Sequence, residues 1–255
     1  MRHTRLSIFT ALLAPALIMM ATVVPLRANE TDNRVERTIK NSYNYKTYLS
    51  RDDIAVHASA GVVTLTGMVV EDSDRALAVE TASGTAGVKS VVSELQVKGE
   101  QPETNSDRWI SMKVKSALAY HKHVSATDTE VETSGGVVTL KGKVGTEAQR
   151  ELTTAYARDV EGVKQVDNQM TVVGAKAHRT AGTKIDDASI TAQIKTSLLF
   201  HHSTHTVATK VTTRNGVVIL RGEAKSGAEK GLVTKLAEDT NGVKRVENLM
   251  TIKPS

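Results

Sequence analysis

The hydrophobic positions of this chain repeat in the same order three times. Each repeat begins with apolar or aromatic residues spaced four apart, which is the stripe of an amphipathic helix. A segment with alternating apolar and polar residues follows near 54–58, 129–133 and 209–213, and this alternation predicts a half-buried strand. The helix positions are Val35, Ile39 and Tyr43, then Ile110, Val114 and Leu118, then Ile190, Ile194 and Leu198.

A glycine-bounded motif marks the next strand of every repeat. It reads GVVTLTG at 61–67, GVVTLKG at 136–142 and GVVILRG at 216–222, and GVKSV, GVKQV or GVKRV follows 26 residues after its first Gly. The first Gly predicts a tight hairpin turn, the last Gly predicts a strand end where a side chain does not fit, and the Gly of GVK predicts a helix end. The structural glycines are Gly61, Gly67, Gly87, Gly136, Gly142, Gly162, Gly216, Gly222 and Gly242.

The order of elements is therefore helix, strand, strand, helix, strand. We predict an α+β fold of three tandem αββαβ modules, each a three-stranded sheet packed against two helices. Module 1 spans residues 31–98, module 2 spans 105–173 and module 3 spans 186–253. The segments 98–104 and 174–186 are polar and lack periodic apolar spacing, so we expect the modules to move relative to one another.

The N-terminal residues have the pattern of a secretory signal. Arg2 and Arg5 precede an apolar stretch from Leu6 to Val24, and the small Ala28 suits the position before a cleavage site. We predict a signal peptide at 1–28, cleavage after Ala28 and a periplasmic location. An uncleaved anchor is the alternative, because the stretch is near the lower length limit for spanning a bilayer.

Charge and composition narrow the function. Removing the signal takes away three arginines and no acidic residue, so 30 basic residues face 28 acidic ones and the net charge falls from +5 to +2. A near-neutral exported chain is a poor candidate for nucleic-acid binding. The chain has no Cys, and the acid pair Asp52 and Asp53 does not recur in the other modules. We therefore expect no enzyme activity and no cofactor.

The paired motifs resemble the BON domain, three times over nearly the whole exported chain. The resemblance rests on the three Gly-Val-Val strands and on GVKSVVSEL, GVKQVDNQM and GVKRVENLM. It implies a non-enzymatic periplasmic role in osmotic or envelope stress, with binding of phospholipid membrane surfaces. The alternative is a periplasmic chaperone or scaffold that uses tandem modules to bind envelope proteins.

Module 3 is the basic part of the chain. Residues 187–253 include 10 basic and 6 acidic residues, whereas residues 105–173 of module 2 include 9 of each and residues 31–97 of module 1 include 7 and 9. This excess favours contact with an anionic phospholipid surface. The residues predicted to make it are Lys210, Arg214, Arg221, Lys225, Lys244 and Arg245.

Trp109 is a second candidate for membrane contact, together with Arg108, Met112 and Lys113 on the same predicted helix. Its equivalents in the other modules are Arg34 and Ser189, so we expect Trp109 to face solvent or a partner. An exposed Trp beside basic residues suits a lipid headgroup interface. Packing against a linker or a neighbouring module is the alternative.

Several histidines fall in the loop after the first helix of modules 2 and 3. His201, His202 and His205 are close enough in sequence to converge on a metal ion, but no Cys or carboxylate is fixed beside them. Solvated loop histidines are the simpler interpretation, and we predict no metal site.

Overall fold

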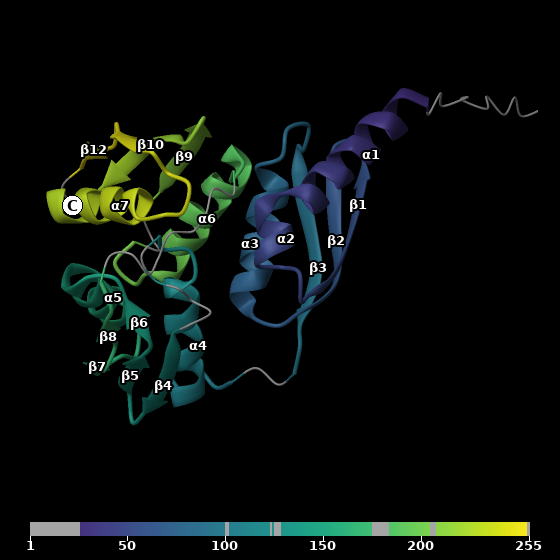
Figure 1. Cartoon of the computed structure of the whole chain (residues 1–255). Coiled ribbons are helices and arrows are strands. Elements are labelled where there is room, and N and C mark those ends of the chain that lie inside the picture. The colour runs from purple at the N-terminus through teal and green to yellow at the C-terminus, as the bar shows by residue number, and fades with distance from the viewer. Residues whose placement is uncertain are drawn as a thin grey trace, which may run out of the picture.

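The computed structural model describes residues 26–99, 102–122, 124, 129–174, 184–204 and 208–253, and it contains three αββαβ modules (Figure 1). Module 1 consists of α1 (Leu26–Asn41), α2 (Tyr43–Thr47), β1 (Asp53–Ser59), β2 (Val62–Val69), α3 (Asp72–Ser83) and β3 (Ser90–Val97). Module 2 consists of α4 (Asp107–Leu118), β4 (Glu130–Ser134), β5 (Val137–Lys141), β6 (Lys143–Val144), α5 (Glu147–Arg158), β7 (Gln165–Asn168) and β8 (Thr171–Val172). Module 3 consists of α6 (Asp187–Phe200), β9 (Thr209–Arg214), β10 (Val217–Ala224), α7 (Gly227–Glu238), β11 (Arg245–Asn248) and β12 (Thr251–Ile252).

The middle strand of each sheet is the Gly-Val-Val strand. In module 1, β2 pairs antiparallel with β1 through the hairpin and parallel with β3 through the crossover helix α3. The same pairing recurs for β5 with β4 and β7, and for β10 with β9 and β11. The predicted α+β fold of three tandem modules is confirmed. The short α2 was not predicted, and the last strand of modules 2 and 3 is divided into two short strands.

The first helix of each module holds the hairpin turn. In module 2 the Asp107 carboxylate accepts hydrogen bonds from the backbone N–H groups of Gly135 at 2.7 Å and Gly136 at 2.9 Å. These two donors hold the pKa of Asp107 below its usual range. Asp32 and Asp187 make the equivalent bonds to the turns of modules 1 and 3. The Asp near the start of each first helix therefore fixes the hairpin turn 28 residues later.

The nine predicted glycines all have positive φ. A Cβ on Gly222 would lie 2.0 Å from the backbone oxygen of Ala208, and one on Gly67 would lie 2.0 Å from that of Asp53. The prediction that this glycine ends the strand is wrong for β2 and β10, which each continue for two residues beyond it. Only Gly142 separates two strands, β5 and β6. The glycine permits close approach of the neighbouring strand rather than termination.

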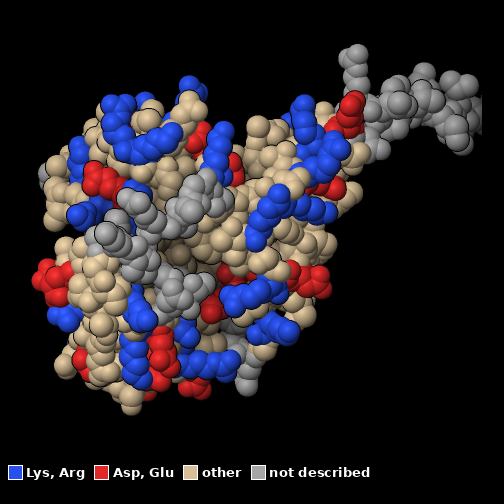
Figure 2. Space-filling view, in the orientation of Figure 1, with Lys and Arg blue, Asp and Glu red and all other residues tan. Residues whose placement is uncertain are grey.

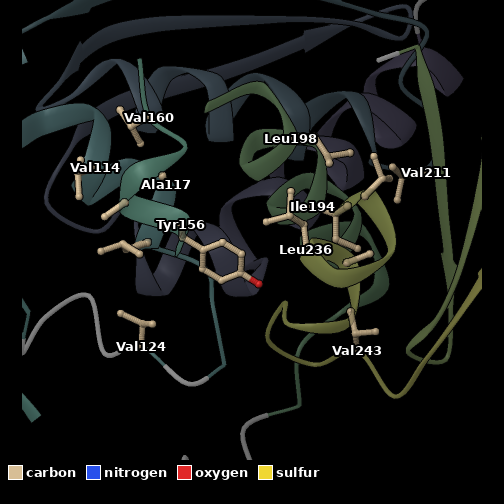
Figure 3. Close-up of a cluster of buried hydrophobic side chains, with 14 of the residues drawn as sticks. Val114, Ala117, Val124, Tyr156, Val160, Ile194, Leu198, Val211, Leu236 and Val243 are labelled. Carbon is tan, nitrogen blue, oxygen red and sulfur yellow. The ribbon is translucent and has the colours of Figure 1, made fainter. Parts of the chain in front are cut away.

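Modules 2 and 3 share one hydrophobic core. Tyr156 of α5 lies between side chains of module 2, such as Val114 and Val160, and side chains of module 3, such as Ile194 and Leu236 (Figure 3). All five residues are nearly inaccessible to solvent. The expectation that these two modules move independently is therefore wrong, because separating them would expose this apolar surface to water.

Module 1 also packs against the others. Tyr120 of module 2 enters the core of module 1, where its ring meets that of Tyr48 edge-on at 5.1 Å. Helix α3 lies along α6 of module 3. Beside this contact, Asn44 donates to the backbone oxygen of Ser189 at 3.2 Å and accepts from Gln193 at 2.7 Å. The polar segments between the modules connect domains that are in contact.

The predicted signal peptide lies mostly outside the described residues. Residues 26–28 belong to the first turn of α1, so cleavage after Ala28 stays a prediction. In the described part of the chain, no helix is both long and apolar enough to cross a membrane.

Candidate functional site

Each sheet has one face covered by helices and one open face. In β10, Val218 and Leu220 point toward the helices and are fully buried. Val217, Ile219 and Arg221 point the opposite way, because side chains alternate along a strand. We call this open side the outer face of the module.

The outer face of module 3 brings four basic side chains together. Lys210 of β9 lies directly opposite Arg221 of β10, and Val217 lies between Arg214 of β9 and Arg245 of β11. Lys and Arg side chains gather along the upper left of the molecule in Figure 2, over the region where Figure 1 places β9 and β10. Four of the six basic residues predicted from sequence thus share one surface.

The charges on this face are poorly compensated. Among the residues that the structure describes, no carboxylate lies within 4.0 Å of Lys210, Arg214 or Arg221, all of which are exposed. Only Arg245 is paired, with Glu247 at 2.5 Å. Like charges directly opposite each other on neighbouring strands destabilise a sheet by a few tenths to about 1 kcal/mol. A bound anion would relieve this repulsion.

The equivalent positions of the other modules carry different chemistry. In module 2, Glu130 lies opposite Lys141, so the cross-strand pair has opposite charges. Lys141 also forms an ion pair with Glu132 at 2.7 Å. In module 1 the pair is Ala55 and Thr66, which has no charge. Module 3 alone of the three replaces this pair with two cations.

Comparison with known proteins identifies the repeated module. The family model described as "BON domain" matches residues 31–99, 106–174 and 186–254. The chain belongs to the BON domain family.

Two similar proteins have names that refer to osmotic induction and to the outer membrane, respectively. The osmotically-inducible protein Y of Escherichia coli (strain K12) is 37% identical over 147 residues, which cover 58% of this chain and 73% of that protein. The outer membrane lipoprotein DolP of Haemophilus influenzae is 34% identical over 108 residues, covering 42% of this chain and 55% of that protein. Among solved structures, CdsD, a structural protein of the type III secretion system of Chlamydia trachomatis, is 17% identical. The match covers 88% of this chain and 92% of the CdsD chain, and its TM-score of 0.22 is too low to support an argument.

Lys225 and Lys244, the other two predicted basic residues, lie outside the paired part of the BON sheet. Lys225 follows β10, and its backbone N–H donates to the Glu229 carboxylate at 2.5 Å. Lys244 precedes β11; its backbone N–H donates to Gly216 at 2.8 Å, and its side-chain stem lies against that glycine. Both side chains are exposed, but the register does not place them on the outer face.

The structure places the Trp109 group at the contact between BON modules 2 and 3. Trp109 is half-buried and lines a groove of about 120 Å³ with Leu199 and Phe200 of α6. Lys113 Nζ lies 5.4 Å from the centre of the Trp109 ring and 4.6 Å from that of Phe200, which are cation–π distances. Trp109 therefore packs against the neighbouring module rather than facing solvent.

The Trp109 group and the basic residues of module 3 do not form one site. Helix α6 covers the inner side of the module 3 sheet, whereas Lys210 and Arg221 point to the outer side. Arg108 is exposed and Met112 is half-buried on α4. The structure thus separates the two sets of residues that the sequence suggested for membrane contact.

The loop histidines are not uniformly solvated. His201 is fully buried, as is His121, its equivalent in module 2, whereas His202 is exposed and His205 lies outside the described residues. Within the described ranges, His, Asp and Glu side chains form no group of three or more that could hold a metal ion. His201 lies 3.3 Å from the carboxylate of Asp159 in module 2.

This pairing of histidine with aspartate was not predicted from the sequence. The sequence does contain a repeat that reflects this pairing: His121 and Asp159 of module 2 recur 80 residues later as His201 and Asp239 of module 3. The glycine motifs of modules 2 and 3 have the same offset. The repeat alone, however, does not show that the histidine of one module meets the aspartate of the other.

Proposed function

We propose that this protein acts in the bacterial envelope as an osmotic or envelope-stress protein, and that it binds anionic phospholipid surfaces through the outer face of module 3. The predicted signal peptide and the names of the two relatives support the location and the role. The basic outer face supports the ligand.

One observation carries the proposal, the opposition of Lys210 and Arg221 without an acidic partner in the described structure. Arg and Lys donors that share one face of a sheet suit a surface of phosphate groups, and each adds about 1 kcal/mol near an anionic membrane. Half-exposed Val217 and Ile219 lie between the cations and provide apolar contact at the headgroup level. Salt should weaken the binding, because the charges are exposed.

Replacing Lys210 with Glu separates binding from folding. Lys210→Glu recreates the opposite-charge pair of module 2, so we expect it to stabilise the protein by about 0.5 kcal/mol. It should nevertheless weaken binding to vesicles of phosphatidylglycerol and phosphatidylcholine roughly tenfold, since it reverses one charge of the face. Urea denaturation and vesicle sedimentation measure the two effects on the same preparation.

Lys235→Glu is the matched control. Lys235 is exposed on α7, on the covered side of the same module, and the substitution makes the same change in net charge. We expect binding within about twofold of the wild type. Equal losses for both variants would show that net charge alone is responsible, and unchanged binding by Lys210→Glu would refute the proposed face.

A chaperone or scaffold role is the second candidate, and the outer face of module 1 favours it. Val62, Met68 and Val92 on this face are 38%, 43% and 45% exposed, and the charged residues paired beside them are the acids Asp53 and Glu94. A face with exposed apolar side chains and no Lys or Arg on its strands suits an unfolded envelope protein better than an anionic membrane.

Val92→Lys tests the second candidate. A charge in the centre of this face should reduce, by at least half, the ability of the protein to suppress aggregation of an unfolded outer-membrane β-barrel protein diluted from urea. Light scattering without any lipid gives the readout. Val173→Lys, at an exposed position of module 2, serves as the control. Equal suppression by both variants and the wild type would exclude this face.

A further inference from the structure

The contact between modules 2 and 3 is reciprocal. His121 Nδ1 of module 2 lies 3.0 Å from Asp239 Oδ2 of module 3, and His201 Nδ1 of module 3 lies 3.3 Å from Asp159 Oδ2 of module 2. Both histidines follow the first helix of their module, and both aspartates cap the second helix. Each module therefore supplies the same two groups, as in the two-fold interface of a homodimer.

Backbone hydrogen bonds follow the same reciprocal rule. The N–H of Lys122 donates to the carbonyl of Asp239 at 2.7 Å, and the N–H of His202 donates to the carbonyl of Asp159 at 3.0 Å. These residues immediately follow the two buried histidines. The backbone thus fixes each imidazole against the carboxylate of the opposite module.

The two imidazoles are enclosed together. His121 is 1% exposed and His201 is 0% exposed, and their ring centres are 5.9 Å apart. Tyr156 stacks on His121 at 4.1 Å and meets His201 edge-on at 5.2 Å. Two protonated rings at this distance, shielded from water, would repel each other and lose their hydration.

We propose that the two His–Asp pairs form an acid-sensitive latch, which keeps modules 2 and 3 in contact while the imidazoles are neutral and releases them when the imidazoles are protonated. Module 1 has Lys46 and Gly84 at the equivalent positions, so it lacks both halves of the latch. The device therefore acts between modules 2 and 3 only.

The direction of the effect follows from burial. Burial lowers the pKa of His201, and the charge of His121 acts in the same sense, against the opposing hydrogen bond and charge of Asp159. The separated modules, with His201 solvated, bind a proton at this residue more readily than the closed form. Closure is therefore most stable above the ordinary histidine pKa near 6.5 and weakens as the pH falls below it.

The other charged groups at this contact do not reverse the effect. Lys122 donates through Nζ to the carbonyls of Glu238 at 2.5 Å and Val243 at 2.8 Å, so a cation already lies next to His121. Burial also raises the pKa of Asp159, but hydrogen bonds from His201 and Ser203 outweigh it and the pKa is lowered. Asp159 thus stays ionised across the range in which His201 titrates. In the described part of the chain, other titratable side chains near the contact are Lys113, Glu151, Tyr156, Glu161, His202, Lys235, Glu238 and Asp239.

The chain contains its own reporter for this opening. Trp109 is the single Trp and lies against α6 at the contact between the two modules. In a chain starting at Asn29, lowering the pH from 7.5 to 5.0 should shift Trp emission to longer wavelength and increase the radius of gyration measured by X-ray scattering. Far-UV circular dichroism should not change, because the modules separate without unfolding.

Three variants assign the transition. His121→Gln with His201→Gln removes both buried imidazoles and should abolish the emission shift, whereas His57→Gln, at an exposed histidine, should keep it. Asp74→Asn should also keep it, which excludes the buried carboxyl cluster of module 1, Asp52, Glu71 and Asp74, as the cause. If the double variant does not fold at pH 7.5, imidazole resonances of the wild type decide, since protonation of two buried histidines must coincide with the emission shift. An unchanged emission and radius in the wild type, or the same shift in a folded double variant, would overturn the latch.

Discussion

Replacing Gly222 with Ala is expected to lower the free energy of unfolding of module 3 by at least about 3 kcal/mol. The new Cβ would lie 2.0 Å from the backbone oxygen of Ala208, and a backbone atom cannot move aside as a side-chain end can. The φ of +135° at Gly222 adds strain for any L-residue. Urea denaturation followed by circular dichroism measures the loss.

Gly231→Ala provides the matched control for the same chemical change. Gly231 lies inside α7, and a Cβ there meets nothing within 4 Å. Ala is favoured over Gly in a helix interior by up to about 1 kcal/mol, so this variant should be slightly more stable than the wild type. A loss below about 1 kcal/mol for Gly222→Ala would show that the strands separate easily at this point.

Gly222 also connects the fold to the proposed membrane face. It pairs with Thr209 at the start of β9, and the next pair in this register is Arg221 with Lys210. Moving β9 away from Gly222 would therefore disturb the opposition of the two cations. The glycine motif has no chemistry of its own, but it sets the strand register on which the basic face depends.

The elements inside each module could be predicted because their physical causes are local. A period of four residues indicated the helices, alternation indicated the strands, and turn residues tolerant of positive φ indicated the hairpin. The short α2 was missed because Tyr43 continues the apolar stripe of α1. In the structure, Ser42 ends one helix by donating to the carbonyl of Ile39 and caps the next by accepting from Tyr45.

The contacts between modules could not be predicted in the same way. Tyr120, His121 and His201 lie just after a helix, where polar and aromatic residues are usually exposed, and their partners come from another module. Burial of a polar side chain requires a specific partner, and the pattern within one module does not identify it. Trp109 was singled out because its equivalents are polar, but its contact with α6 became visible only in three dimensions.

An acidic cluster lies at the contact between modules 1 and 2. Its effect on stability changes with pH in the direction opposite to that of the His–Asp latch between modules 2 and 3. Burial, followed by the charges of Asp52 and Glu71, raises the pKa of Asp74 to about 7. Tyr120 of module 2 is buried beside these carboxyls. Folded Asp74 thus keeps a proton that the unfolded chain releases near pH 4, so its contribution to stability is present below pH 4 and is lost as the pH rises to 7.

Asp74→Asn should therefore stabilise the protein at pH 8 and leave it nearly unchanged at pH 4. The raised pKa sets a ceiling of roughly 4 kcal/mol, and because the buried amide still loses hydration we expect about 2 kcal/mol. The carbonyl oxygen of the introduced amide can keep the hydrogen bond from the Glu71 N–H, since the side-chain amide of Gln149 accepts the equivalent bond in module 2.

Urea denaturation at both pH values, with the exposed Asp53→Asn as the control, measures the difference. An equal gain at pH 4 and pH 8 would show that the charge of Asp74 is not the cause. The contact of module 1 and the His–Asp latch respond to pH in opposite directions. If Asp74→Asn stabilises the contact of module 1, the latch is left as the main source of acid sensitivity in that variant.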